Sequence, residues 1–147
     1  MTDARRLASV VRVRDLQARV AEAAAAARTR EAEARHAAVA EAHAALDRAV
    51  DDASSLSFLA FAQRQTSIEG ALFSVHRRTD EAAEAQRSLD AARHVWTVAR
   101  QRHEGVERLH DRLVDDERTD ALRQEQREVD DLVTITHART TRDGDPG

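Results

Sequence analysis

Residues 50–56, VDDASSL, form the one early break in a chain whose pattern is otherwise helical. The carboxylates of Asp51 and Asp52 suit the C-terminal end of a helix poorly, and the serines that follow offer an N-cap for a second helix. A short break between two helical segments favours an antiparallel hairpin. We therefore expect a single hairpin domain over residues 1–140, with helix one at about 4–52, a turn at about 53–56, helix two at about 56–138, and a disordered tail at 141–147.

Apolar residues on both sides of the break recur at alternating spacings of three and four, which is typical of a coiled coil. In helix one the stripe reads Val13, Leu16, Val20, Ala23 and Ala27, and then Val39, Ala42, Leu46, Ala49, Ala53 and Leu56. Alanines four apart at positions 34, 38 and 42 predict a local stutter between these two blocks. In helix two the stripe reads Phe58, Phe61, Ile68, Leu72, Val75, Ala82, Leu89, Ala92, Trp96, Ala99, Val106, Leu109 and Leu113. The sequence thus predicts an all-α fold, a long antiparallel two-helix coiled coil with an alanine-rich seam.

Composition limits the kinds of protein that this chain can be. Of its 147 residues 30 are alanine and 34% are charged, so it can cover a narrow seam better than it can fill a large core. The absence of cysteine excludes disulfides and thiolate metal sites and fits a reducing compartment. Arginines interrupt every apolar run near the N-terminus, so we expect no signal peptide and no transmembrane segment. The net charge is −4 and is concentrated in the C-terminal third, which disfavours nucleic acid as a partner.

The predicted helices differ in length, so helix two must extend past helix one. If residue i of helix one faces residue 108 − i of helix two, helix one ends opposite Gly105 and residues 106–138 form an overhang. Between residues 106 and 131 this overhang carries ten carboxylates and five arginines. Its apolar residues form a thin stripe, Val106, Leu109, Leu113, Leu122, Val129 and Leu132. We expect a partner protein to cover this stripe and the flanking charges to select that partner, although such a helix can also be a solvated surface.

Few residues point to catalysis or to metal binding. The sequence contains no lysine and therefore no phosphate-binding P-loop, and a two-helix coiled coil offers no pocket that excludes water, so we do not expect an enzyme or a cofactor. His103, Glu107 and His110 share one helical face, and His36 and His43 lie seven apart, but neither set has a fourth ligand and we expect no metal site.

Aromatic residues are few in this chain. Trp96 lies at a seam position, where packing is its expected role. Phe58, Phe61 and Phe73 lie near the predicted turn and are either packing residues or a docking surface.

Two stretches of the chain resemble the flagellar FliJ family. One runs from Trp96 through Leu109, Asp111 and Arg112 to the signature Glu125-Gln126-Arg127 and Asp130-Asp131, which is similar to the Glu-Gln-Lys-x-x-Asp-Glu-like ending of that family. The other is the opening stretch LASVVRVRDLQARVAEA, residues 7–23. Arg127 replaces the usual lysine and Asp131 the usual glutamate, so the charges are kept, whereas residues 57–80 agree with the family only in apolar spacing.

The resemblance implies a non-enzymatic stalk and adaptor of the type III protein export apparatus at the base of the flagellum. It implies a cytoplasmic protein, peripheral at the inner face of the cell membrane, which binds the export ATPase ring, the membrane export gate and export chaperones. We assign the ATPase contact to Leu109, Leu113, Glu125, Gln126, Arg127, Asp130 and Asp131. We assign the gate contact to Phe58, Phe61, Ile68, Leu72 and Phe73. We expect a monomer when the chain is alone; the alternatives are a self-associating coiled-coil scaffold and the equivalent stalk of a virulence secretion system.

Overall fold

The computed structural model describes the backbone of residues 3–51 and 57–143, with side chains as far as His137, and it consists of two long helices. Helix α1 spans Asp3–Asp51 and helix α2 spans Phe58–Asp143. The expected turn at 53–56 lies outside the described residues. Helix α2 begins two residues later than predicted and continues through residues 141–143, which the sequence had assigned to the tail.

Ser57 explains where α2 begins. Its hydroxyl accepts a hydrogen bond from the backbone N–H of Ala60 at 3.3 Å, and its carbonyl accepts one from the N–H of Phe61 at 3.0 Å. This is the geometry of a serine N-cap, which satisfies N–H groups that a first helical turn leaves without a partner. The N-cap is therefore Ser57, not Ser54 or Ser55 as the sequence suggested.

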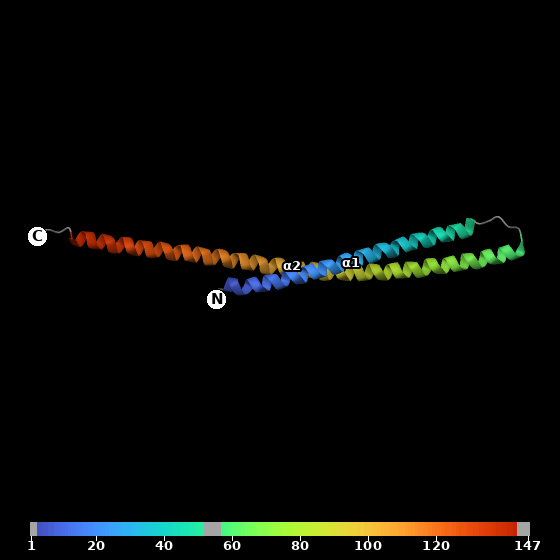
Figure 1. Cartoon of the computed structure of the whole chain (residues 1–147), viewed down its shortest axis with the longest axis horizontal. Helices are drawn as coiled ribbons and strands as arrows, with labels where there is room; N and C mark the ends of the chain where they lie inside the picture. Colours follow the sequence, from blue (N-terminus) through green and yellow to red (C-terminus); the bar gives the residue numbers. More distant parts are fainter. Residues whose placement is uncertain (1–2, 52–56, 144–147) are drawn as a thin grey trace. The chain divides into compact units, whose positions relative to one another are not determined.

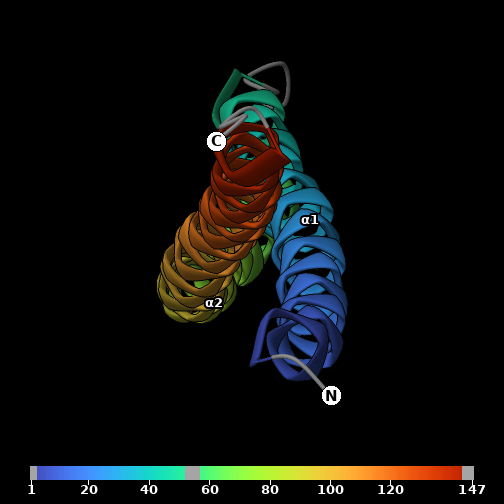
Figure 2. The ribbon, with the colours of Figure 1, turned by 90° about the vertical axis from the view of Figure 1, so that its left-hand side faces the viewer.

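The chain divides into two compact units, one of Asp15–Gln101 and one of Met1–Arg14 with Arg102–Gly147. In the first unit α1 and α2 lie side by side and run in opposite directions (Figures 1 and 2). Its buried residues are Ala21, Ala25, Ala32, Ala42, Val75, Ala82, Ala85 and Leu89. Ala32, Ala85 and Leu89 form one cluster, in which the small alanines let the two helix axes approach closely. The prediction of an all-α antiparallel hairpin is confirmed.

In the first half of α1 the seam was predicted on the wrong side of the helix. Leu16 and Val20 are each 62% exposed, whereas the alanines at 21, 25 and 32 are buried. From Ala32 to Ala49 the inward positions 32, 35, 39, 42, 46 and 49 keep a regular heptad spacing, so the stutter predicted at 34–42 is absent. The physical reason is close packing. At a short interaxial distance the seam accepts alanine, and the larger Leu16 and Val20 face away from α2.

The register of the hairpin also differs from the predicted one. Arg35 of α1 contacts Glu81 of α2, eight residues further along α2 than residue 73, which the midpoint of the break had suggested. At the end of α1 the guanidinium of Arg64 donates a hydrogen bond to the carbonyl of Val50, capping the helix C-terminus. The first two turns of α2 therefore precede the paired region. For that reason Phe58 and Phe61 are 86% and 62% exposed and do not belong to the seam.

The second unit contains the start of α1 and the C-terminal part of α2. The backbone N–H of Ala4 lies 3.4 Å from Oε1 of Glu117, so a carboxylate of α2 faces the positive end of α1. Ala4 is buried, and Val106, His110 and Leu113 of α2 are half-buried. Pairing within this unit thus extends to Glu117 and not only to Gly105. The overhang of α2 is confirmed, but it begins about a dozen residues later than predicted.

Candidate functional site

Residues 118–135 of α2, which we call the exposed segment, are solvent-exposed at every position. The described part of α1 begins at Asp3, close to Glu117, so the exposed segment continues beyond it within the same unit. Five large apolar residues of this segment are more than half exposed: Leu122, Val129, Leu132, Val133 and Ile135 at 58%, 53%, 64%, 62% and 52%. A helix of this length gains little stability from such side chains in water, and exposed apolar residues in a row are typical of an interaction surface.

The apolar residues of the exposed segment do not continue the seam. Leu113 is the last large apolar seam residue, and Leu122, Val129 and Val133 follow it by nine, sixteen and twenty residues. At 3.6 residues per turn these intervals are about two and a half, four and a half, and five and a half turns. The three side chains therefore lie on the side of α2 opposite Leu113. We call this set the apolar face.

Polar residues occupy the positions that do continue the seam. Gln124, Arg127 and Asp131 follow Leu113 by eleven, fourteen and eighteen residues, which is about three, four and five whole turns. We call this set the polar face; Ile135 lies near its C-terminal end. The single apolar stripe predicted from Val106 to Leu132 is therefore wrong, because Val106 and Leu113 are half-buried seam residues and Leu122 and Val129 face the other way.

The signature residues divide between the two faces. Arg127 and Asp131 belong to the polar face, Gln126 lies beside the apolar face, and Glu125 and Asp130 lie at the two edges of the apolar face. The side-chain amide of Gln126 donates to Oδ1 of Asp130 at 3.0 Å, one helical turn away. Sequence spacing alone could have separated these residues by face, but only if the phase of the seam had been known.

The remaining residues assigned to the ATPase contact are Leu109 and Leu113. Leu109 is 50% exposed, and Leu113 is half-buried where the start of α1 pairs with α2. Leu113 is thus only partly available to another protein.

The residues assigned to the gate contact form two separate patches. Phe58 and Phe61 lie in the first turn of α2, and Leu72 and Phe73, which are 41% and 71% exposed, lie about three turns further on. Between the patches the amide of Gln65 donates to Oε1 of Glu69 at 3.1 Å. Ile68 is half-buried at a seam position, so the structure does not bring it together with the exposed aromatic residues.

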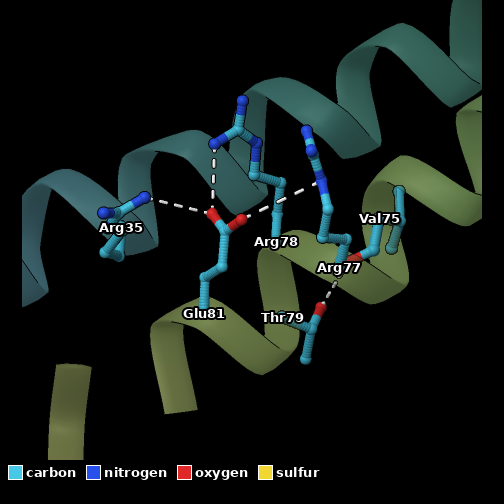
Figure 3. A network of polar contacts seen from close by, with 6 residues as sticks. All are labelled: Arg35, Val75, Arg77, Arg78, Thr79 and Glu81. Carbon is cyan, nitrogen blue, oxygen red and sulfur yellow. Dashed lines mark hydrogen bonds and ion pairs between the residues drawn. The ribbon is translucent and has the colours of Figure 1, made fainter. Parts of the chain in front are cut away.

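Sequence reasoning missed a polar cluster around Glu81 (Figure 3). Its carboxylate lies 3.1 Å from the guanidinium of Arg35 on α1, 3.1 Å from that of Arg78 and 3.9 Å from that of Arg77 on α2. A shallow depression of about 330 Å³ adjoins the cluster and is lined by Arg28, Glu31, Arg35, Glu81, Glu84, Ala85 and Ser88. The signal in the sequence was the arginines at seam positions 35 and 78, which require a carboxylate nearby.

The histidines considered as metal ligands have other surroundings. His103 and His110 are half-buried in the pairing of the second unit, whereas Glu107 is exposed. Nδ1 of His110 lies 3.3 Å from Oδ1 of Asp111, and Nδ1 of His36 lies 2.7 Å from the carbonyl oxygen of Ala32. Among the described residues no group of three His, Asp or Glu side chains could hold a metal ion.

Comparison with known proteins identifies the family. Within residues 3–51 and 57–143 neither helix has a stretch long and apolar enough to cross a membrane. No curated protein and no solved structure matches the chain significantly. The family described as "Flagellar FliJ protein" matches residues 3–142, which is nearly the whole chain and includes both helices. The chain therefore belongs to the flagellar FliJ family, whose members are components of the flagellar export apparatus.

Proposed function

We propose that this protein is a non-enzymatic stalk and adaptor of the flagellar type III export apparatus, and that the exposed segment binds the ring of the export ATPase. The observation that carries the proposal is the set of five large apolar residues within residues 118–135, each more than half exposed. Family membership supports the setting, because a component of the export apparatus needs a surface for its neighbours. The exposed segment is a single helix, which is a suitable shape for insertion between subunits or into a ring.

The aromatic patch at the start of α2 is proposed as the contact with the export gate. Phe58 and Phe61 lie three residues apart and are 86% and 62% exposed, and aromatic side chains are frequent in the energetic centres of interfaces. Phe73 and Leu72 form a second patch that the same partner could contact. Export chaperones are the third proposed class of partner. We place the protein in the cytoplasm, peripheral at the inner face of the membrane near the flagellar base.

Binding of the purified full-length protein to its cognate export ATPase tests the first contact. We expect a complex, and a change in the assembly or the activity of the ATPase when the protein is added. If neither is observed, the proposed function is wrong. Light scattering of the protein alone provides the second measurement: an elongated monomer of 16.3 kDa agrees with a stalk, and a stable dimer or tetramer at micromolar concentration favours the coiled-coil scaffold instead.

The gate contact has its own matched pair of variants. Phe58→Ser with Phe61→Ser should weaken binding to the cytoplasmic part of the gate protein by about tenfold or more, because aromatic anchors dominate such interfaces. Val95→Ser is the control, since Val95 is 59% exposed on the same helix but far from the aromatic patch. Equal effects of the two variants would contradict the assignment.

A further inference from the structure

We propose that the exposed segment binds its partner mainly through the apolar face, Leu122, Val129 and Val133, and that the partner presents an apolar groove with lysine or arginine at its rim. This inference rests on the proposed function, in which the partner is the export ATPase. It assigns the binding energy to residues outside the Glu125–Asp131 signature, with the single exception of Val129.

The first step is the change of face along α2. Up to Leu113 the inward positions carry apolar residues that pair with α1, as the half-burial of Val106 and Leu113 indicates. Beyond Glu117 the same line of positions carries Gln124, Arg127 and Asp131, all exposed. A helix that approached along this line would have to desolvate charged groups without an apolar core beneath them, which costs free energy. The polar face therefore disfavours extension of the hairpin seam by a second copy or by another helix.

The second step is the chemistry of the apolar face. Leu122, Val129 and Val133 are spaced by seven and four residues, so they lie on one side of the helix, and Glu125 and Gln126 occupy the turn between Leu122 and Val129. Leu132 lies at the edge beside Glu125 and widens the apolar face. A partner that covers this face removes three or four large side chains from water, which is the main favourable contribution available to a single helix.

The third step is the charge at the rim. Around Val129 and Val133 the edges of the apolar face carry Glu125 and Asp130. Asp130 accepts a hydrogen bond from the neutral amide of Gln126, so its negative charge is not neutralised by that contact. Arg123 lies nearer Leu122 and is held by Asp120 at 3.2 Å. Since the C-terminal half of the face is edged by carboxylates, electrostatic complementarity favours a partner groove whose rim is basic.

Two triple variants of the full-length chain test the choice of face. One replaces Leu122, Val129 and Val133 by serine, and the matched control, on the side of the polar face, replaces Asp120, Gln124 and Glu128 by serine. All six positions are exposed, so neither variant should lose the hairpin, and circular dichroism of both provides the check. We expect the apolar-face variant to bind the export ATPase on the order of tenfold to a hundredfold more weakly, and the control to remain within about threefold of the wild type.

A charge-reversal variant tests the rim. We expect the wild-type protein to bind the ATPase more weakly at higher salt concentration. Glu125→Lys with Asp130→Lys should slow association with the ATPase and remove this salt dependence. Faster association of this variant would overturn the basic rim.

The remaining outcomes are distinct from one another. An equal or larger loss in the polar-face control, with wild-type binding intact, overturns this inference and leaves the proposed function standing. Absence of wild-type binding to the ATPase overturns both. Self-association of the wild type that only the apolar-face variant abolishes would make a second copy the occupant of this face, and it would also overturn the inference.

Discussion

In the first unit Glu81 joins the two helices electrostatically through its carboxylate. It contacts Arg35 of α1 and Arg77 and Arg78 of α2, so one negative charge holds three positive ones near the seam. The side chains of Glu81 and Arg35 are 32% and 42% exposed, and solvent screening therefore keeps the contribution of their ion pair small. The pair fixes the register more than it adds stability.

Replacement of Glu81 by glutamine should lower the free energy of unfolding by about 0.5–1 kcal/mol, because it removes the attraction and leaves the arginines close together. Urea denaturation at low and high salt measures the loss, which should shrink as salt increases. Glu84→Gln is the control. Glu84 pairs with Arg87 on its own helix, and their side chains are 71% and 68% exposed, so we expect no measurable change.

Leu89 is the largest well-buried side chain of the described core, at 4% exposure, and it packs against Ala32 and Ala85. Leu89→Ala should cost about 2–3 kcal/mol of unfolding free energy, since the surrounding alanines cannot fill the space. Leu16→Ala is the matched control on α1, where the leucine is 62% exposed, and it should change the stability little. A loss for Leu16→Ala as large as that for Leu89→Ala would show that the predicted seam through Leu16 and Val20 was the correct one.

At the scale of the elements, α1 is a helix with apolar residues on two opposite sides. The side that packs against α2 is built mostly from alanine, while Leu16 and Val20 face outward. Sequence spacing could not choose between these sides, because both follow a three-and-four pattern and the outward one has the larger residues. The choice depends on how closely the two helices approach, which is a property of the pair and not of either helix.

Leucine at position 32 should separate the two helices and destabilise the hairpin by about 1–3 kcal/mol, because Ala32 is 3% exposed and in contact with α2. Leucine at position 34, two residues further on, should be tolerated, because Ala34 is exposed and the helix propensities of the two residues are similar. Thermal unfolding of the two single variants gives the comparison. Equal stability of the two would contradict the heptad phase described for α1.

Helix α2 changes its role along its length. Its seam residues were predicted well from Val75 to Ala99 and again at Val106 and Leu113, where large residues and alanines keep a regular spacing. The predicted seam failed at Phe58, Phe61, Leu72 and Leu109, which are exposed. Phe58 and Phe61 lie in the first turns of α2, which precede the region paired with α1. The sequence could not show this, because it did not fix the register of the two helices.

For the whole molecule, the exposed segment should contribute to binding and hardly at all to stability. A chain that ends at residue 121 keeps the contact of Ala4 with Glu117 and one further turn of α2. Its urea midpoint should equal that of the full-length protein, while its binding to the export ATPase should be lost. A drop in the midpoint comparable to that of Leu89→Ala would indicate that the removed part of the chain packs against the rest of the protein.

The sequence by itself determined that this chain forms two long helices, that they are joined near residues 52–57, and that the second is longer. These features follow from alanine-rich helix propensity, from a single break and from the difference in length on its two sides, all of which are local. Membership in the FliJ family could also be recognised from the sequence, through the signature near residues 125–131.

The tertiary structure alone decided which sides of the helices meet and how far they are displaced along each other. Because alanine is small and frequent, several alternative pairings of the two helices would bury similar apolar areas. The sequence therefore does not determine which sides meet or in which register. Contacts such as Arg35 with Glu81 and Ala4 with Glu117 remove that degeneracy because they join residues far apart in the chain. The same contacts place the end of the pairing at Glu117, and so they separate the apolar face of residues 118–135 from the seam.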